Sequence, residues 1–141
     1  MKRFVRMVWL FVAVSIVVAV PAYAAEQSQR SSSFFTSFTA YCYESTSTRL
    51  AVYFRVLATG TMDELGASVV KIQQSSDGTN WETVKTFNKE TFSQMTDTNT
   101  RMHATTLYYP KTSGYYYRAY VTFYAKNSTG TGKYYYYTPV I

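Results

Sequence analysis

Residues 115–125 read Tyr-Tyr-Tyr-Arg-Ala-Tyr-Val-Thr-Phe-Tyr-Ala, the longest alternating run in the chain. In a β-strand, successive side chains point to opposite faces, so every second residue shares a face. One face of this run carries Tyr117, Ala119, Val121, Phe123 and Ala125, and the other carries Tyr116, Arg118, Tyr120, Thr122 and Tyr124. The run therefore predicts a long strand whose first face lies in a hydrophobic core.

The same period of two recurs along most of the chain after residue 33. It predicts further strands at Phe34–Tyr43, Leu50–Leu57, Ala67–Ser75, Trp81–Phe87, Thr100–Tyr108 and Lys133–Thr138. Asp77-Gly78 separates two of these segments and is typical of a hairpin turn. A register that pairs Ser75 with Trp81 would place Ile72 opposite Val84 on the core face. We expect residues 58–66 to form a loop, with Met62 and Leu65 covering one end of the core.

Seven short strands separated by Gly, Pro, Asn and Ser turns predict one all-β domain over residues 34–141. The architecture that fits is a seven-stranded antiparallel β-sandwich. Within the strand at 100–108 we expect Met102 and Ala104 to point inward and His103 to lie on the surface. Cys42 is the only cysteine. Its place in an alternating segment favours a small buried side chain over a reactive thiol or an intermolecular disulfide.

Two segments resemble fibronectin type III and related immunoglobulin-like modules. Residues 72–81, which end Ser-Asp-Gly-Thr-Asn-Trp, resemble the hairpin in which a turn leads into a tryptophan. Residues 115–127 together with Gly130 resemble the F strand and the turn that follows it. The strand is longer than in that family, and the tryptophan of its B strand is absent. The resemblance implies an immunoglobulin-like or fibronectin type III-like sandwich.

The chain as a whole resembles a family of small secreted proteins of unknown function from Gram-positive, often gut-dwelling, bacteria. The stretches that carry this resemblance are 60–62, 65–68, 73–81, 84–87, 114–119 and 121–128. They cover most of the chain beyond residue 33. The family has no established activity or site, so the resemblance implies a secreted bacterial protein and nothing more specific.

The first 24 residues have the layout of a secretory signal peptide. Three basic residues lie between positions 2 and 6, Val8–Val20 is apolar, and Pro21-Ala22-Tyr23-Ala24 ends in a small-x-small cleavage site. The apolar run is short for a membrane-spanning helix. We therefore expect cleavage after Ala24, a secreted extracellular protein without membrane attachment, and a polar flexible arm over residues 25–33.

Charge and composition disfavour several classes of function. The chain has a formal net charge of +6, but three of its fourteen lysines and arginines lie in residues 1–24, which leaves eleven against eight acids, or +3. These charges are scattered, whereas nucleic-acid binders usually concentrate them in a stripe. One histidine, one cysteine and eight dispersed acids provide no metal-ligand spacing and no evident acid–base pair. We expect no enzymatic activity, no metal and no cofactor.

Tyrosine is the residue that stands out. Fourteen of the fifteen tyrosines lie beyond residue 24, and nine of them fall between positions 115 and 137. If the last two strands pair, their outward face combines one side of residues 115–125 with either Tyr134 and Tyr136 or Tyr135 and Tyr137. Tyrosine offers a rigid apolar ring with a hydrogen-bonding tip and is common in binding surfaces. The candidate binding residues are Trp81, Tyr116, Arg118, Tyr120, Tyr124, Tyr135 and Tyr137.

These residues leave several interpretations open. The first is a non-catalytic binding or interaction module that uses the tyrosine face, with a protein or a glycan surface as its partner. The second is a carbohydrate-binding module in which Trp81 and outward tyrosines stack on sugar rings. The third is a structural protein that associates with copies of itself through an exposed strand. The tyrosine face could also be only a stabilising wall, because cross-strand aromatic pairs contribute about 0.2–1 kcal/mol each.

Overall fold

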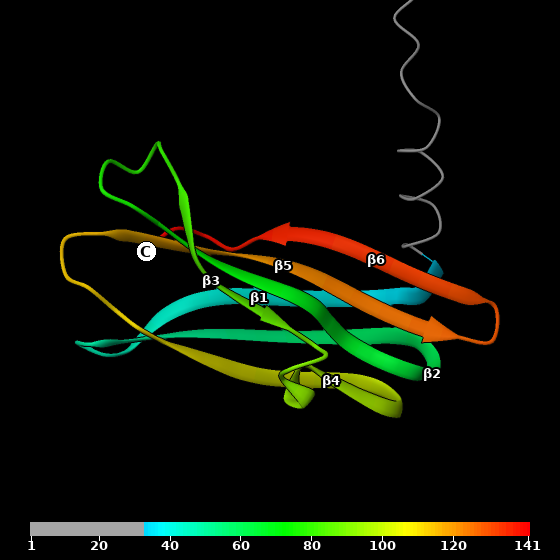
Figure 1. Cartoon of the computed structure of the whole chain (residues 1–141). Helices are drawn as coiled ribbons and strands as arrows, with labels where there is room; N and C mark the ends of the chain where they lie inside the picture. Colours follow the sequence, from blue (N-terminus) through cyan, green and yellow to red (C-terminus); the bar gives the residue numbers. More distant parts are fainter. Residues whose placement is uncertain (1–32) are drawn as a thin grey trace, which may run out of the picture.

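The structure is a computed structural model that describes residues 33–141. The predicted signal peptide, its cleavage site at Ala24 and all but the last residue of the predicted arm lie outside the described residues. The described part contains β1 (Phe35–Thr46), β2 (Arg49–Ser75), β3 (Glu82–Asn88), the short 3-10 helix η1 (Ser93–Met95), β4 (Thr96–Pro110), β5 (Tyr116–Asn127) and β6 (Gly130–Tyr137). All strand pairs are antiparallel and belong to one curled sheet (Figure 1). The all-β prediction is confirmed, with six strands in place of seven.

The long strand β2 organises the sheet because it is paired on both edges along most of its length. Its first half pairs with β1 on one edge and with β4 on the other. Its second half pairs with β5 on one edge and with β3 on the other. β6 then adds to the far edge of β5. Figure 1 shows β2 passing from the first group of strands to the second.

The predicted loop at 58–66 is wrong, because these residues form the middle of β2 and join two predicted strands into one. Met62 and Leu65 are buried as expected, and both belong to the ladder with β4, opposite Thr100 and Asp97. This pairing satisfies backbone groups that a loop would leave to water. Gly66 ends the segment predicted to be a loop. A Cβ at this position would lie 2.1 Å from the carbonyl oxygen of Met95, so the glycine instead permits the close approach of two backbones.

The core lies on the inner face of the curled sheet. The residues predicted to face inward from β5 are all fully buried, as are the predicted inward residues of β2: Leu50, Val52, Phe54 and Val56. Phe54 from the first half of the sheet meets Phe123 from the second half, with ring centroids 6.1 Å apart at 80°. Phe38 of β1 packs on Phe123 and also on Tyr134 of β6, at 5.2 and 4.2 Å. The two halves of the sheet therefore share one core, and their outer faces point away from each other.

The prediction for β4 is wrong by one residue. Met102 is 48% exposed and Ala104 is exposed, whereas Leu107 is buried and His103 is half-buried against the ring of Phe54. The Nε2 atom of His103 lies 2.9 Å from the carbonyl oxygen of Gln94. The cause is the register with β2, which places His103 opposite the inward residue Val56. The strand is rich in threonine and carries too weak an apolar pattern to reveal this.

The prediction for Cys42 is confirmed, whereas the predicted register of the hairpin is wrong. Cys42 is 6% exposed, and its Sγ lies 3.3 Å from the Thr138 hydroxyl. This burial confirms the interpretation of Cys42 as a small buried residue, and it also raises the pKa of the thiol. The hairpin register differs from the expected one: Ile72 pairs with Lys85, and an irregularity follows between Ile72 and Gln73. Val84 still packs on the core as a partly buried residue.

Candidate functional site

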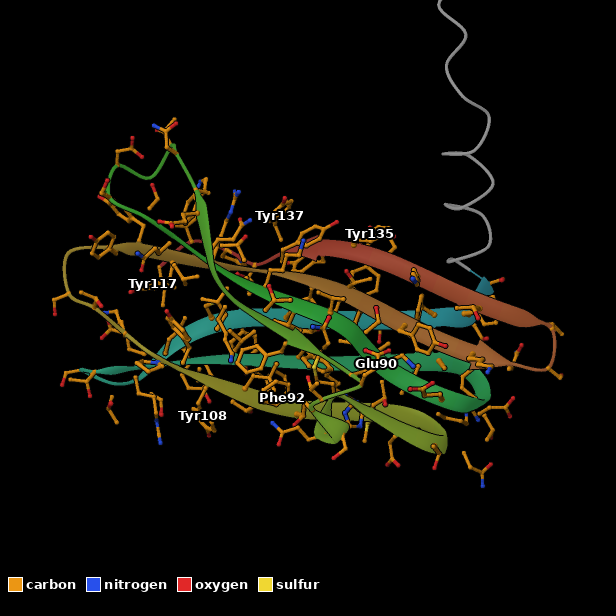
Figure 2. All side chains as sticks on the ribbon, in the orientation of Figure 1. Glu90, Phe92, Tyr108, Tyr117, Tyr135 and Tyr137 are labelled. Atoms are coloured by element: carbon orange, nitrogen blue, oxygen red, sulfur yellow. The ribbon has the colours of Figure 1, made fainter. Side chains whose placement is uncertain are left out.

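Five of the seven predicted site residues form a continuous row on the outer face of the second half of the sheet. We call this row the aromatic–arginine strip; it consists of Trp81, Arg118, Tyr120, Tyr135 and Tyr137. Strand pairing assembles it, because Tyr120 of β5 lies directly opposite Tyr137 of β6. Figure 2 shows Tyr135 and Tyr137 on the outer side of β6. The register thus selects Tyr135 and Tyr137 for the outward face, while Tyr134 and Tyr136 pack on Phe38.

Arg118 is held in the middle of the strip. The Cζ atom of its guanidinium group lies 4.3 Å from the ring centroid of Trp81 and 4.4 Å from that of Tyr137. Its Nε donates a hydrogen bond of 2.8 Å to Oε1 of Gln73 on β2. Among residues 33–141, its two terminal nitrogens have no hydrogen-bond acceptor. The side chain is therefore oriented in advance, with its donor edge unused.

Tyr120 supports the two exposed rings of the strip. Its ring is nearly parallel to that of Tyr135, at 11° and 6.0 Å, and lies 4.6 Å from the ring of Tyr137. Tyr135 and Tyr137 are each 50% exposed, while Tyr120 is half-buried between them. Burial, and then the proximity of Tyr137 and Tyr135, raise the pKa of Tyr120. Each exposed ring thus packs against Tyr120, and only part of its surface is accessible to a ligand.

The other two predicted residues lie outside the strip. Tyr124 is only 9% exposed, because Lys89 from the segment after β3 lies over its ring at 4.5 Å. The Lys89 ammonium also contacts both carboxylate oxygens of Glu64, at 2.9 and 3.0 Å. The expectation that Tyr124 would be an accessible contact residue is therefore wrong. Tyr116 is 48% exposed but lies beside the hairpin tip, where a Cβ on Gly78 would be 3.7 Å from its ring.

A hollow adjoins Trp81 at one end of the strip. It is lined by Gln74, Ser75, Ser76, Asn80, Trp81, Glu82 and Tyr115. The Asp77 carboxylate holds the hairpin at its rim by accepting hydrogen bonds from the backbone amides of Thr79 and Asn80, both at 2.8 Å. These bonds hold the pKa of Asp77 far below its ordinary value. The hollow combines two aromatic rings with amide, hydroxyl and carboxyl groups, a mixture that suits a hydroxylated ligand.

Sequence reasoning missed a second aromatic surface on the outer face of the first half of the sheet. We call it the second tyrosine face; it consists of Tyr41, Tyr43, Arg49, Tyr53 and Tyr108. Tyr41 and Tyr53 are paired across the strands, with rings 5.0 Å apart. Ala51 of β2 is paired with Tyr43 of β1 on one side and with Tyr108 of β4 on the other. The outward alternation of tyrosine in residues 41–53 was the only available signal, because Tyr108 joins the face through the register of β4.

The two outer faces share an electrostatic character. The first carries Lys71 and Arg118 together with Lys133 at its end, and the second carries Arg49 and Arg55. No acidic residue is paired across neighbouring strands with a tyrosine of either face. On the first face Glu64 is paired with Lys89, while Glu82 lines the hollow beside Trp81 and Asp77 lies at its rim. Both faces therefore combine aromatic rings with basic side chains.

Within the described residues, no three His, Cys, Asp or Glu side chains gather to hold a metal ion. The same part of the chain has no helix of the length and apolarity needed to cross a membrane. Comparison with known proteins found no matching family model, no matching curated protein and no matching solved structure.

Proposed function

We propose that this protein is a secreted, non-catalytic binding module that holds an acidic polysaccharide on its aromatic–arginine strip. The observation that carries the proposal is the position of Arg118, which is fixed between Trp81 and Tyr137 with its terminal nitrogens unused. A guanidinium group with two free terminal nitrogens can donate a pair of parallel hydrogen bonds to the two oxygens of a carboxylate. Because Gln73 and the two rings already restrain the side chain, little conformational entropy is lost on binding.

The surroundings of Arg118 favour a sugar over an acidic peptide. Trp81 and Tyr137 each have one ring face against the guanidinium, and the exposed remainder of these rings offers apolar surface to sugar rings, as Tyr and Trp do in other binding surfaces. The hollow beside Trp81 adds Gln74, Asn80 and Glu82 as partners for hydroxyl groups. A polymer of carboxylated sugars would use the ring surface, the cation and the hollow together. Neutral sugars would leave Arg118 without a partner.

The stabilising-wall interpretation is compatible with part of this arrangement. Tyr120 packs between Tyr135 and Tyr137, so the strip stabilises the sheet as well as presenting a surface. A wall alone does not require a fixed cation with an unused donor edge. Self-association of the two outer faces is disfavoured because both carry positive charge. Pairing through an edge strand would instead show as a mass that rises with concentration.

We also propose that the curled sheet is a variant of the immunoglobulin-like or fibronectin type III-like sandwich, in which β2 passes from one layer to the other. The contact of Phe54 with Phe123 between the inner faces supports this. Secretion, by way of the signal peptide at 1–24, and membership of a family of small secreted Gram-positive proteins are part of the same proposal.

The proposal is tested with polygalacturonate, a polymer of carboxylated sugars, and with its methyl ester, which keeps the rings and removes the charges. The mature protein, residues 25–141, should bind immobilised polygalacturonate and bind the methyl ester at least about tenfold more weakly, or about 1.4 kcal/mol. Arg118→Met should cause a loss of similar size on the acidic polymer. Arg101→Met, at an exposed arginine outside both faces, is the matched control and should change nothing. Equal binding of the acid and the ester would reject the proposal.

A further inference from the structure

The second tyrosine face contains a hollow that repeats the chemistry of the strip. The hollow lies at the end of the β1–β2 hairpin and is lined by Thr46, Thr48, Arg49, Tyr108, Tyr109 and Pro110. The Arg49 guanidinium lies over the ring of Tyr108, with Cζ 4.4 Å from the centroid, the same distance as between Arg118 and Tyr137. Arg49 also donates a hydrogen bond of 3.3 Å to the Ser45 hydroxyl. Both outer faces thus present an arginine restrained on a tyrosine ring beside a concave surface.

The walls of this second hollow are tied together by contacts between strands. The backbone amide of Lys111 donates a hydrogen bond of 2.8 Å to the carbonyl oxygen of Thr48, which joins the end of β4 to the β1–β2 turn. The Lys111 ammonium pairs with the Glu44 carboxylate, the acid at this end of the sheet. Arg49 therefore has no carboxylate partner among the described residues. The local charge favours an anionic ligand.

The two hollows belong to faces that point away from each other. The inner faces of the two halves of the sheet meet in the core, so the outer faces lie on opposite sides of the molecule. Figure 2 shows Tyr108 on the side of β4 that is remote from Tyr135 and Tyr137. A single small ligand could not span them. Two chains of a polymer, or two segments of one flexible chain, could occupy both.

We propose that the second tyrosine face is a second binding site for carboxylated polysaccharide, so that one monomer bridges two polymer segments. This inference rests on the proposed function, because it assigns the same ligand class to a second surface. Bivalency raises the apparent affinity for a polymer, since the second contact forms at a high effective concentration. It also gives the protein the capacity to cross-link such polymers.

The test measures two quantities on the same variants of the mature protein: binding to immobilised polygalacturonate, and agglutination of polygalacturonate-coated beads. The wild type should bind and agglutinate as a monomer, as checked by its mass in solution. Arg49→Met and Arg118→Met should each abolish agglutination and weaken apparent binding by at least about tenfold through lost avidity. The double variant should lose binding, and Arg101→Met should behave as the wild type. Denaturation curves of the variants establish that they are folded.

The two proposals fail in distinguishable ways. If Arg118→Met loses binding but Arg49→Met agglutinates beads as well as the wild type, the second site is rejected and the proposed function stands. If Arg49→Met loses binding and Arg118→Met does not, the strip is rejected as the site. Agglutination by a dimeric wild type would overturn bivalency of the monomer. A wild type that binds no polygalacturonate overturns both proposals.

Discussion

The two outer faces of this sheet have similar composition but different internal organisation. On the first face, rings and guanidinium form one connected row from Trp81 through Arg118 and Tyr137 to Tyr120 and Tyr135. On the second face, Tyr41 with Tyr43 and Tyr53 forms one cluster, while Arg49 with Tyr108 forms a separate pair. A connected row restrains its members through one another. We therefore expect the first face to be the more rigid of the two and, under the proposed function, to bind the polymer more tightly.

The most damaging change should break the scaffold that both faces share. Phe54 is fully buried between Phe123 and His103, where the two halves of the sheet meet. Phe54→Ala should lower the free energy of unfolding by about 3–5 kcal/mol, because it leaves a cavity at this junction. Urea denaturation would measure this. Val140→Ala, at an exposed residue, is the control and should lie within about 0.5 kcal/mol of the wild type. A small effect of Phe54→Ala would mean that the halves do not share a core.

A change at Gly66 should be nearly as severe and has a different cause. An alanine Cβ would lie 2.1 Å from the Met95 carbonyl oxygen, and the residue has φ of +156°. Gly66→Ala should therefore separate β4 from β2 and reduce the melting temperature strongly. Gly60→Ala is a suitable control, since a Cβ there meets nothing within 4 Å. Similar melting temperatures for the two variants would contradict the close backbone approach at Gly66.

The difference in organisation predicts unequal losses when one ring is removed from each face. Tyr120→Ser removes contacts with two rings and should cost about 1 kcal/mol of stability, since each cross-strand aromatic pair contributes about 0.2–1 kcal/mol. Tyr53→Ser removes one such contact, with Tyr41, and should cost about half as much. Chemical denaturation of both variants measures the difference. If Tyr53→Ser were the more damaging, the first face would not be the more rigid one.

The smallest expected effect is a pH dependence confined to the first face. The pKa of Tyr120 is raised in the folded protein, so the folded state keeps this proton at a pH where the unfolded chain has lost it. The stabilisation should be fully present below about pH 10, the ordinary tyrosine value, and should decline as the pH rises through the folded pKa. Stability measured between pH 9 and 11 should fall less steeply in Tyr120→Phe than in the wild type. Parallel curves would contradict the environment assigned to Tyr120.

The fold could be predicted where one strand carries a complete pattern. The alternation of residues 115–125 and 50–56 was sufficient to predict these strands and their inward faces. Each run places its apolar residues on one face, and that face is buried. It failed for β4, whose inward side is set by pairing with β2, and for 58–66, where Gly66 marks a backbone contact. Both failures depend on partners that are distant in the sequence.

The candidate site shows the same division between local and distant information. The clustering of tyrosine located the strip, and alternation identified Arg118 and Tyr120 as outward residues. The placement of Arg118 between Trp81 and Tyr137 depends on three separate segments, so no local pattern reveals it. Tyr124 was misassigned because its cover, Lys89, comes from a segment without regular structure. The second tyrosine face was not predicted, because its members are spread through the sequence from position 41 to position 108.

The most direct test of the central claim is the affinity of residues 25–141 for polygalacturonate and for its methyl ester, measured side by side with wild type and Arg118→Met. We predict that the wild type prefers the acidic polymer by at least about tenfold and that Arg118→Met binds this polymer at least about tenfold more weakly than the wild type does. Equal affinity of the wild type for both polymers, or wild-type affinity of Arg118→Met for the acidic polymer, would contradict the proposed function. The tyrosines of the first face would then be explained by their contribution to stability alone.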